Sequence, residues 1–226
     1  EHRTSWIFSE EYLGWPLNGP RQPVVRVSWE RAMAFCDWLS RKTGLRVSLP
    51  TEGQWEYACR AGSDTPFWYG TADRDFSALA NMADWTIRNL AYEGWRPKSP
   101  DLVPRDARSN DGKLVTADVA SYAPNPWGLY DMHGNAAEWT RSTWRPYPFD
   151  EADGRASVRI AAAEAGTPAG GKVVRGGSWH DRPARCRSSF RLSYPAWQRV
   201  YNVGFRVVIE PAVGQMAHHN GSDRLE

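Results

Sequence analysis

The sequence predicts one domain in which two helices and several short strands are connected by long irregular loops. A chain of 226 residues, 41% of them hydrophobic, is long enough to bury one sizeable core. Thirteen Trp, 16 Pro and 19 Gly indicate many short connections packed by large flat side chains, which is not typical of a helix bundle. Helical spacing of apolar residues occurs mainly in two segments, 29–43 and 52–60.

Both predicted helices carry their own start and stop signals. Ser28 fits an N-cap for a helix over Trp29–Thr43, and Gly44 would end that helix. Thr51 caps a second amphipathic helix, Glu52–Arg60, which ends before the next glycine.

Short strands are predicted where β-branched and aromatic residues gather. They are Pro23–Val27, Leu45–Leu49, a turn and strand within 129–140, Val173–Val174 and Phe205–Ile209. Between residues 63 and 122 the sequence predicts turns without regular helices or strands, and it contains many Asp and Asn residues among aromatic ones. So long a stretch without regular elements is unusual in a compact domain unless it is functional or held by ions.

The charge balance and the cysteines exclude several classes of protein. With 28 basic and 26 acidic residues, a net charge of +2 gives no argument for nucleic acid or for an acidic membrane surface. Cys36, Cys59 and Cys186 predict no disulfide framework, and there is no apolar run long enough to span a membrane. Residues 1–20 lack the form of a signal peptide, yet a chain that begins with Glu1 is compatible with a removed leader or a larger parent protein. The sequence therefore assigns the protein to no particular compartment.

The segment 178–201 concentrates arginines and aromatic side chains. Each guanidinium needs partners or water, so a loop this rich in arginine cannot be buried entirely. We therefore predict that it recognises a peptide, a protein or a small acidic ligand, although a solvated face and a core role for Trp179 are the alternatives. The candidate ligand-binding residues are Trp179, His180, Arg182, Arg185, Arg187, Arg191, Tyr194, Trp197 and Tyr201.

Five blocks along the chain together resemble the formylglycine-generating enzyme and sulfatase-modifying factor family. They are PVVRVSWERAMAFCDWLS (23–40), LPTEGQWEYACRAG (49–62), NPWGLYDMHGNAAEWT (125–140), VVRGGSW (173–179) and NVGFRVV (202–208). The resemblance implies an α+β domain with a C-type-lectin-like architecture over residues 23–210, with the family's opening segment absent. Residues 1–22 would then be a connecting segment and 211–226 a polar tail, and another segment of a parent protein could complete the domain.

The resemblance implies an altered reaction centre. In the copper-dependent oxidases of the family, the serine that corresponds to Ser178 lies beside the reaction centre and two later cysteines hold copper(I). Those two positions are Asp181 and Cys186 here, and a carboxylate is a poor ligand for a soft monovalent ion. Ser178, Asp181 and Cys186 are thus the candidate catalytic residues, copper binding is not expected, and a merely buried Cys186 is the alternative.

A second branch of the family, the iron-dependent ergothioneine-type sulfur transferases, is matched in part. Arg182-Pro183 and Phe190-Arg191 stand where that branch has an Arg-Pro and a Phe-Arg. Its iron ligands come from a separate domain, and no pair of histidines at helical spacing backed by a carboxylate is present in this sequence.

The resemblance also implies structural calcium, which takes hard oxygen ligands. One site would use Asp131 and Glu138 with the carbonyl oxygens of Gly134 and Ala136. The other would use Asn81 and Asp111 with the carbonyl oxygens of Met82 and Lys113. The alternative is that these polar side chains only accept backbone N–H groups in turns.

Two functions therefore stay open. The first is a binding domain that displays the 178–201 loop without the two-cysteine copper site. The second is an oxidoreductase of the formylglycine-generating or ergothioneine-type class, dependent on copper or iron, that acts on a cysteine-containing substrate.

Overall fold

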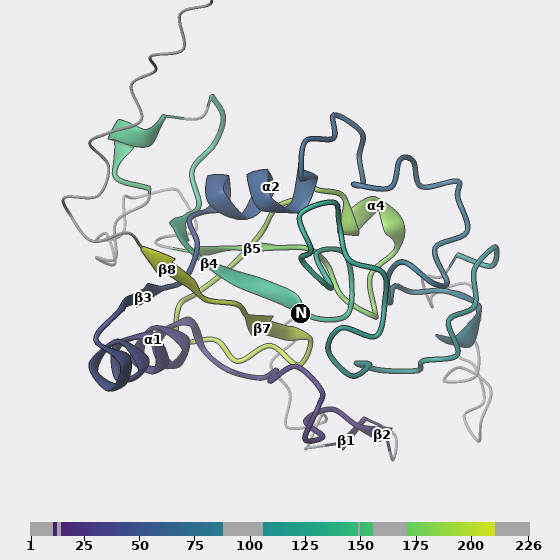
Figure 1. The fold of residues 1–226 in the computed structure, drawn as a ribbon, viewed down its shortest axis with the longest axis horizontal. Helices are drawn as coiled ribbons and strands as arrows, with labels where there is room; N and C mark the ends of the chain where they lie inside the picture. Colours follow the sequence, from purple (N-terminus) through teal and green to yellow (C-terminus); the bar gives the residue numbers. More distant parts are fainter. Residues whose placement is uncertain (1–10, 13–14, 88–105, 149, 156–170, 211–226) are drawn as a thin grey trace, which may run out of the picture.

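The computed structural model describes residues 11–12, 15–87, 106–148, 150–155 and 171–210. A four-stranded sheet in the order β6-β5-β4-β7 forms its centre (Figure 1). The strands are β4 (Ala137–Thr143), β5 (Lys172–Arg175), β6 (Leu192–Tyr194) and β7 (Val203–Phe205). β5 is antiparallel to both of its neighbours, whereas β7 runs parallel to β4.

Two helices lie on opposite sides of this sheet (Figure 1). α1 (Trp29–Thr43) begins at Ser28, whose side chain accepts the N–H of Arg31, and ends at Gly44 in the left-handed conformation. α2 (Glu52–Arg60) begins at Thr51 with a capping box. Both helices therefore start and end where their local signals predict.

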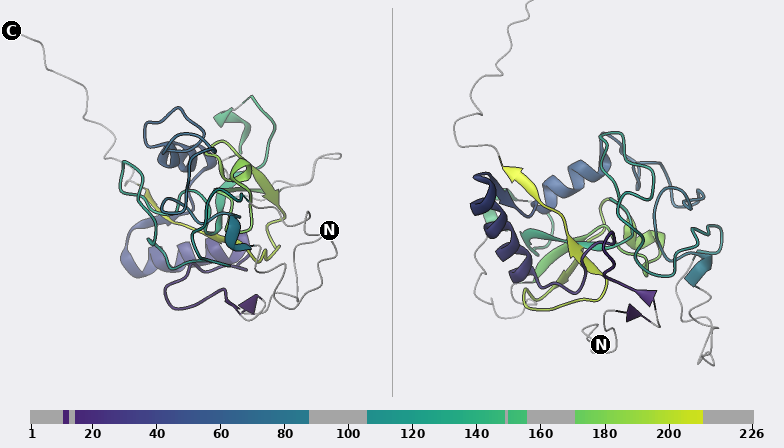
Figure 2. Two further views of the ribbon diagram at one scale, coloured as in Figure 1. Left: turned by 90° about the vertical axis from the view of Figure 1, so that its right-hand side faces the viewer. Right: turned by 60° about the horizontal axis from the view of Figure 1, so that its bottom comes forward.

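The remaining elements are short. β1 (Glu11–Tyr12) pairs with β2 (Trp15–Pro16), and β3 (Arg46–Ser48) pairs with β8 (Val208–Glu210), both antiparallel. Three further elements are single helical turns: η1 (Trp85–Ile87), η3 (Glu151–Asp153) and α4 (Pro183–Cys186). The long stretches 61–84 and 106–136 contain turns and isolated bridges and gather at the end of the molecule opposite α1 (Figure 2). None of the described helices is long and apolar enough to cross a membrane.

The core divides along the sheet. Ala32 and Cys36 of α1 pack with Trp139 and Val174 of the sheet on one side. On the other side Trp55 of α2 lies in a smaller cluster with Cys59 and Met132. Leu17, within the segment expected to be a connection, is fully buried in the larger cluster.

Two strand predictions need correction. Residues 23–27 are not a strand, because Arg26 has φ +62° and its N–H donates to the Val200 carbonyl. The predicted strand 205–209 is two strands, β7 and β8, which are separated at Arg206 and Val207. There the guanidinium of Arg206 binds the Glu138 carboxylate, with its Nε 2.6 Å from Oε2.

Candidate functional site

Two glycines and one helical turn build the loop that follows β5. Gly176 and Gly177 both have positive φ, and a Cβ atom on Gly177 would lie only 2.4 Å from Sγ of Cys186. Glycine is therefore required at 177 both for conformation and for space. The turn of α4 then returns the chain, so that Cys186 Sγ lies 3.7 Å from the Asp181 carbonyl oxygen.

Ser178 and Asp181 form a buried hydrogen-bonded group with Asn202. The Ser178 hydroxyl donates to Oδ2 of Asp181 at 2.6 Å and accepts from Nδ2 of Asn202 at 2.7 Å. All three residues are almost fully buried, and Arg185 contributes a guanidinium 3.7 Å from Oδ1 of Asp181. The Asp181 carboxylate is thus bound on both oxygens and fastens the loop to the turn before β7.

Cys186 is a protonated thiol in these surroundings. It is fully buried, and burial, followed by the nearby charge of Asp181, holds the pKa of the thiol well above its usual range. Copper(I) prefers two thiolates, whereas this position offers one buried thiol beside one engaged carboxylate. The residues present therefore do not fit the two-thiol copper site.

His133 is a buried residue that the sequence analysis did not single out. Its Nδ1 lies 2.7 Å from the Cys186 carbonyl, its Nε2 accepts the N–H of Trp68, and Cys59 Sγ lies 3.6 Å from Nε2. Burial lowers the pKa of His133 to about 4 and raises that of Cys59 to about 12. A neutral imidazole therefore ties α2, the 66–70 turn and the Cys186 loop together.

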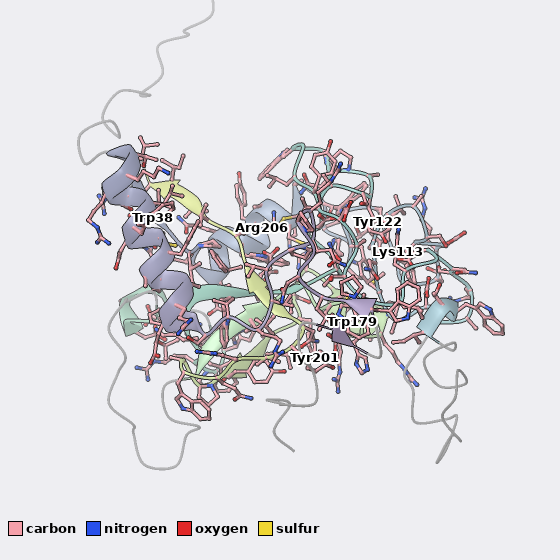
Figure 3. The ribbon with its side chains drawn as sticks, turned by 90° about the horizontal axis from the view of Figure 1, so that it is seen from below. Trp38, Lys113, Tyr122, Trp179, Tyr201 and Arg206 are labelled. Atoms are coloured by element: carbon pink, nitrogen blue, oxygen red, sulfur yellow. The ribbon has the colours of Figure 1, made fainter. Side chains whose placement is uncertain are left out.

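The predicted ligand-binding residues separate into a buried and an exposed set. Trp179 and Tyr201 are buried, with ring centroids 6.1 Å apart (Figure 3), and Nε of Arg191 lies 2.7 Å from the Glu52 carboxylate. Tyr194 packs on Trp139. His180 is half-buried against the Trp179 and Tyr201 rings, whereas Arg182, Arg185, Arg187 and Trp197 are exposed.

Asp131, Ala136 and Glu138 of the first predicted calcium site line a pocket of about 340 Å³. Asp131, with φ +55°, accepts the N–H of Ala120 on Oδ2, while its Oδ1 is buried without a hydrogen-bond donor among the described residues. Glu138 is already bound by Arg206 and by the indole N–H of Trp55. Oδ1 of Asp131 is thus the atom that fits a cation here, and Gly134 and Ala136 lie in the same turn.

The second predicted site contains more carboxylate than expected. Asp111 accepts the N–H of Lys113 and the hydroxyl of Tyr122, and its own N–H donates to Asp84, which was not among the predicted ligands. Burial, followed by the charge of Asp84, raises the pKa of Asp111 to about 7. Oδ1 of Asn81 is buried without a donor in the described part of the chain, and Met82 follows it directly.

The comparisons with known proteins bear on this arrangement. The sequence pattern of the sulfatase-modifying factor enzyme 1-like domain, FGE-sulfatase, matches residues 16–211. The chain belongs to the FGE-sulfatase family. This membership confirms the family predicted from the five sequence blocks.

The relatives in this family include proteins named as formylglycine-generating enzymes and proteins named as inactive. Bovine formylglycine-generating enzyme is 29% identical over 198 residues, which cover 84% of this chain and 44% of the relative. Mouse inactive C-alpha-formylglycine-generating enzyme 2 is 30% identical over 190 residues, covering 81% of this chain and 48% of the relative. This chain therefore spans about half the length of the curated relatives that it matches.

Among solved structures, PvdO from Pseudomonas aeruginosa superimposes with a TM-score of 0.61 at 30% identity. The match covers 86% of this chain and 64% of PvdO. The mixed fold of few helices, short strands and long loops is thus that of its family, as predicted.

Proposed function

We propose that this domain binds an acidic segment of a partner protein through the exposed face of the 178–201 loop. The observation that carries the proposal is a set of exposed arginines in this loop that no acidic side chain of the described residues neutralises. Arg182, Arg187 and Arg199 are exposed and have no carboxylate partner among the described residues. The loop's own acid, Asp181, is buried and already bound.

Trp197 supplies the apolar part of the proposed surface. Its side chain is 61% exposed, which is unusual for the largest apolar residue, and it lies two residues from Arg199. Aromatic and arginine side chains are the residue types that most often dominate binding energy at protein interfaces. The proposed ligand is therefore an acidic segment that also presents an apolar side chain.

The proposal includes no two-thiol copper chemistry. The support is the hydrogen-bonded group of Ser178, Asp181 and Asn202, because it engages the carboxylate of the residue that, by the family resemblance, corresponds to the first copper ligand. The name of the mouse relative indicates that the family includes inactive members.

A dye-labelled peptide of alternating Glu and Leu, and its twin with Gln in place of Glu, test the proposal in a fluorescence anisotropy titration. We expect the acidic peptide to bind at least about tenfold more tightly than its twin, with an affinity that falls as salt rises. The double substitution Arg182→Ala with Arg187→Ala should abolish the difference, whereas Arg41→Ala on α1 should leave it unchanged. Equal binding of the two peptides to the native chain would refute the proposal.

The alternative function is an oxidoreductase that acts on a cysteine-containing substrate. The observation that favours it is the likeness to bovine formylglycine-generating enzyme. Formation of formylglycine from a cysteine peptide, measured by mass spectrometry, would decide in favour of this alternative.

A further inference from the structure

A second pocket lies beside α2, outside both predicted calcium sites. Its volume is about 340 Å³, and it is lined by Glu52, Gly53, Glu56, Tyr57 and Arg60 of α2 and by Tyr147 of the segment after β4. Figure 1 shows α2 and that segment on the same side of the central sheet. Pockets that hold small ligands measure about 300 to 1,000 Å³. This one therefore has room for a small ligand or for one end of a longer one.

Two exposed tyrosine rings line the pocket and are held in place. Tyr57 is 69% exposed and Tyr147 is 60% exposed. The Tyr57 ring packs edge-on against Trp127, with centroids 4.8 Å apart, and the Arg191 guanidinium lies 4.8 Å from the centre of the Tyr147 ring. Arg191 is itself fixed, because its Nε lies 2.7 Å from the Glu52 carboxylate. Both rings are thus oriented before a ligand arrives, which lowers the entropy cost of binding.

The two carboxylates that line the pocket are already neutralised. Each is paired with two arginines: Glu52 with Arg155 and Arg191, and Glu56 with Arg60 and Arg175. A cationic ligand would therefore gain little from them. Of the four arginines only Arg60 lines the pocket, so an anionic ligand would meet the carboxylates first. The charges favour an uncharged ligand.

Arg60 leaves hydrogen-bonding capacity at the pocket. A guanidinium has five N–H groups. Arg60 donates three hydrogen bonds to described residues, two to the Glu56 carboxylate and one to the Thr65 carbonyl. Its side chain is partly exposed, so its other N–H groups can reach a ligand. A donor beside a carboxylate matches neighbouring hydroxyl groups, because each hydroxyl both donates and accepts.

We propose that this pocket binds an uncharged sugar ring of a glycan. The C–H groups on one face of a sugar ring pack on aromatic rings, while its edge carries hydroxyl groups. Tyr57 and Tyr147 would contact the ring face, and Arg60 with Glu56 would bind the hydroxyls. A proline-rich segment would also pack on tyrosines, but it brings no hydroxyl groups to the polar side of the pocket. The residues that line the pocket all lie outside the 178–201 loop, so the inference is independent of the proposed function.

A glycan array probed with the dye-labelled native chain is the first test, because it presents uncharged and acidic glycans side by side. We expect the chain to bind a group of uncharged glycans. The uncharged oligosaccharide that binds best is then titrated by calorimetry. Its affinity should not fall as salt rises, in contrast to that of the acidic peptide described above.

Variants of the two tyrosines locate the binding. Tyr57→Ala and Tyr147→Ala should each weaken binding of this oligosaccharide at least about tenfold, because each removes a ring that the sugar contacts. Trp38→Ala, at an exposed ring of α1, is the control and should change the affinity by less than about twofold. The double substitution Arg182→Ala with Arg187→Ala should leave glycan binding unchanged, so this proposal and the proposed function can fail separately.

Crystals of the native chain soaked in the oligosaccharide decide the question without any variant. A sugar ring in contact with Tyr57 and Tyr147 is expected. Failure to bind every uncharged glycan, or binding that both alanine variants leave unchanged, would overturn the proposal. A polyproline peptide that displaces the oligosaccharide and binds more tightly, with an affinity that Tyr147→Ala lowers, would overturn it in favour of a proline-rich partner.

Discussion

Burial strongly affects the pKa values and the hydrogen bonds of several single residues in this chain. Burial is the main reason why the pKa of His133 is lowered from the usual 6.5 to about 4, so this imidazole is neutral at neutral pH. Ser178, Asp181 and Asn202 similarly hold one another in a fixed arrangement by hydrogen bonds that water does not reach. The consequences of changing such groups can be derived from their partners.

We predict that His133 makes the domain acid-labile. Between pH 6.5 and pH 4 the unfolded chain binds a proton at this histidine that the folded chain does not. Its contribution to stability is therefore complete above pH 6.5 and is lost as pH falls towards 4, by about 3 kcal/mol in all. Chemical denaturation at several pH values should show a shallower acid loss for His133→Gln than for the native chain. An equal acid loss for His133→Gln and the native chain would contradict this role.

We also predict that Asn202→Ala loosens the Ser178 loop. The substitution removes a donor to Ser178 and leaves that hydroxyl and the Asp181 carboxylate with one partner fewer. A buried acceptor that loses its donor costs about 1 to 3 kcal/mol. Urea denaturation measures this cost, and a loss no larger than that of an exposed control such as Arg41→Ala would contradict the role given to Asn202.

At the scale of elements, the helices followed from the sequence and part of the sheet did not. Ser28, Gly44 and Thr51 are local signals, so both helices could be predicted to the residue. The run 23–27 has the composition of a strand, but its conformation is set by contacts with Val200 and with β7 that lie far along the sequence. The candidate site shows the same division. The resemblance to the family motif singled out Ser178, Asp181 and Cys186. Asn202, His133 and Asp84 could not be predicted in this way, because their contacts exist only in the folded chain.

The close approach of residue 24 to β7 leads to a prediction for two matched Gly→Ala substitutions. A Cβ atom on Gly204 would lie 2.3 Å from the Val24 carbonyl oxygen, whereas one on Gly44 would meet nothing within 4 Å. Gly44→Ala therefore costs only the left-handed backbone strain, about 1 kcal/mol. Gly204→Ala must displace backbone and should cost at least about 2 kcal/mol more. Similar losses for both in urea denaturation would show that residues 23–25 do not pack against β7.

At the scale of the whole molecule, ions are expected to hold the long loops that the sheet and helices do not. The stretches 61–84 and 106–136 contain few regular elements, yet they bury Asn81, Asp84 and His133 almost completely. In these stretches the side-chain oxygens Oδ1 of Asn81 and Oδ1 of Asp131 are buried and receive no hydrogen bond from the described residues. The sequence predicted that these stretches are rich in oxygen-bearing side chains, and the structure adds which of the oxygens have no donor in the described part of the chain.

We predict that calcium raises the melting temperature of the domain and that Asp131→Ala removes part of this gain. An ion that binds only the folded state adds about 2.7 kcal/mol at one hundred times its dissociation constant. Scanning calorimetry in calcium and in excess chelator measures the difference. An unchanged melting temperature in chelator would contradict a structural role for calcium at either site.

Copper(I) titration of the native chain and of Asp181→Cys, with formylglycine formation from a cysteine peptide followed in parallel, tests the central claim most directly. The claim is that this family member binds a ligand and lacks the two-thiol centre. The Cys186 thiol lies 3.7 Å from the backbone carbonyl oxygen of residue 181, so the backbone at 181 is already close to this thiol. The account predicts no tight copper binding and no formylglycine for the native chain, and a gain of copper affinity for Asp181→Cys. Formylglycine formation by the native chain that Cys186→Ser abolishes would contradict it.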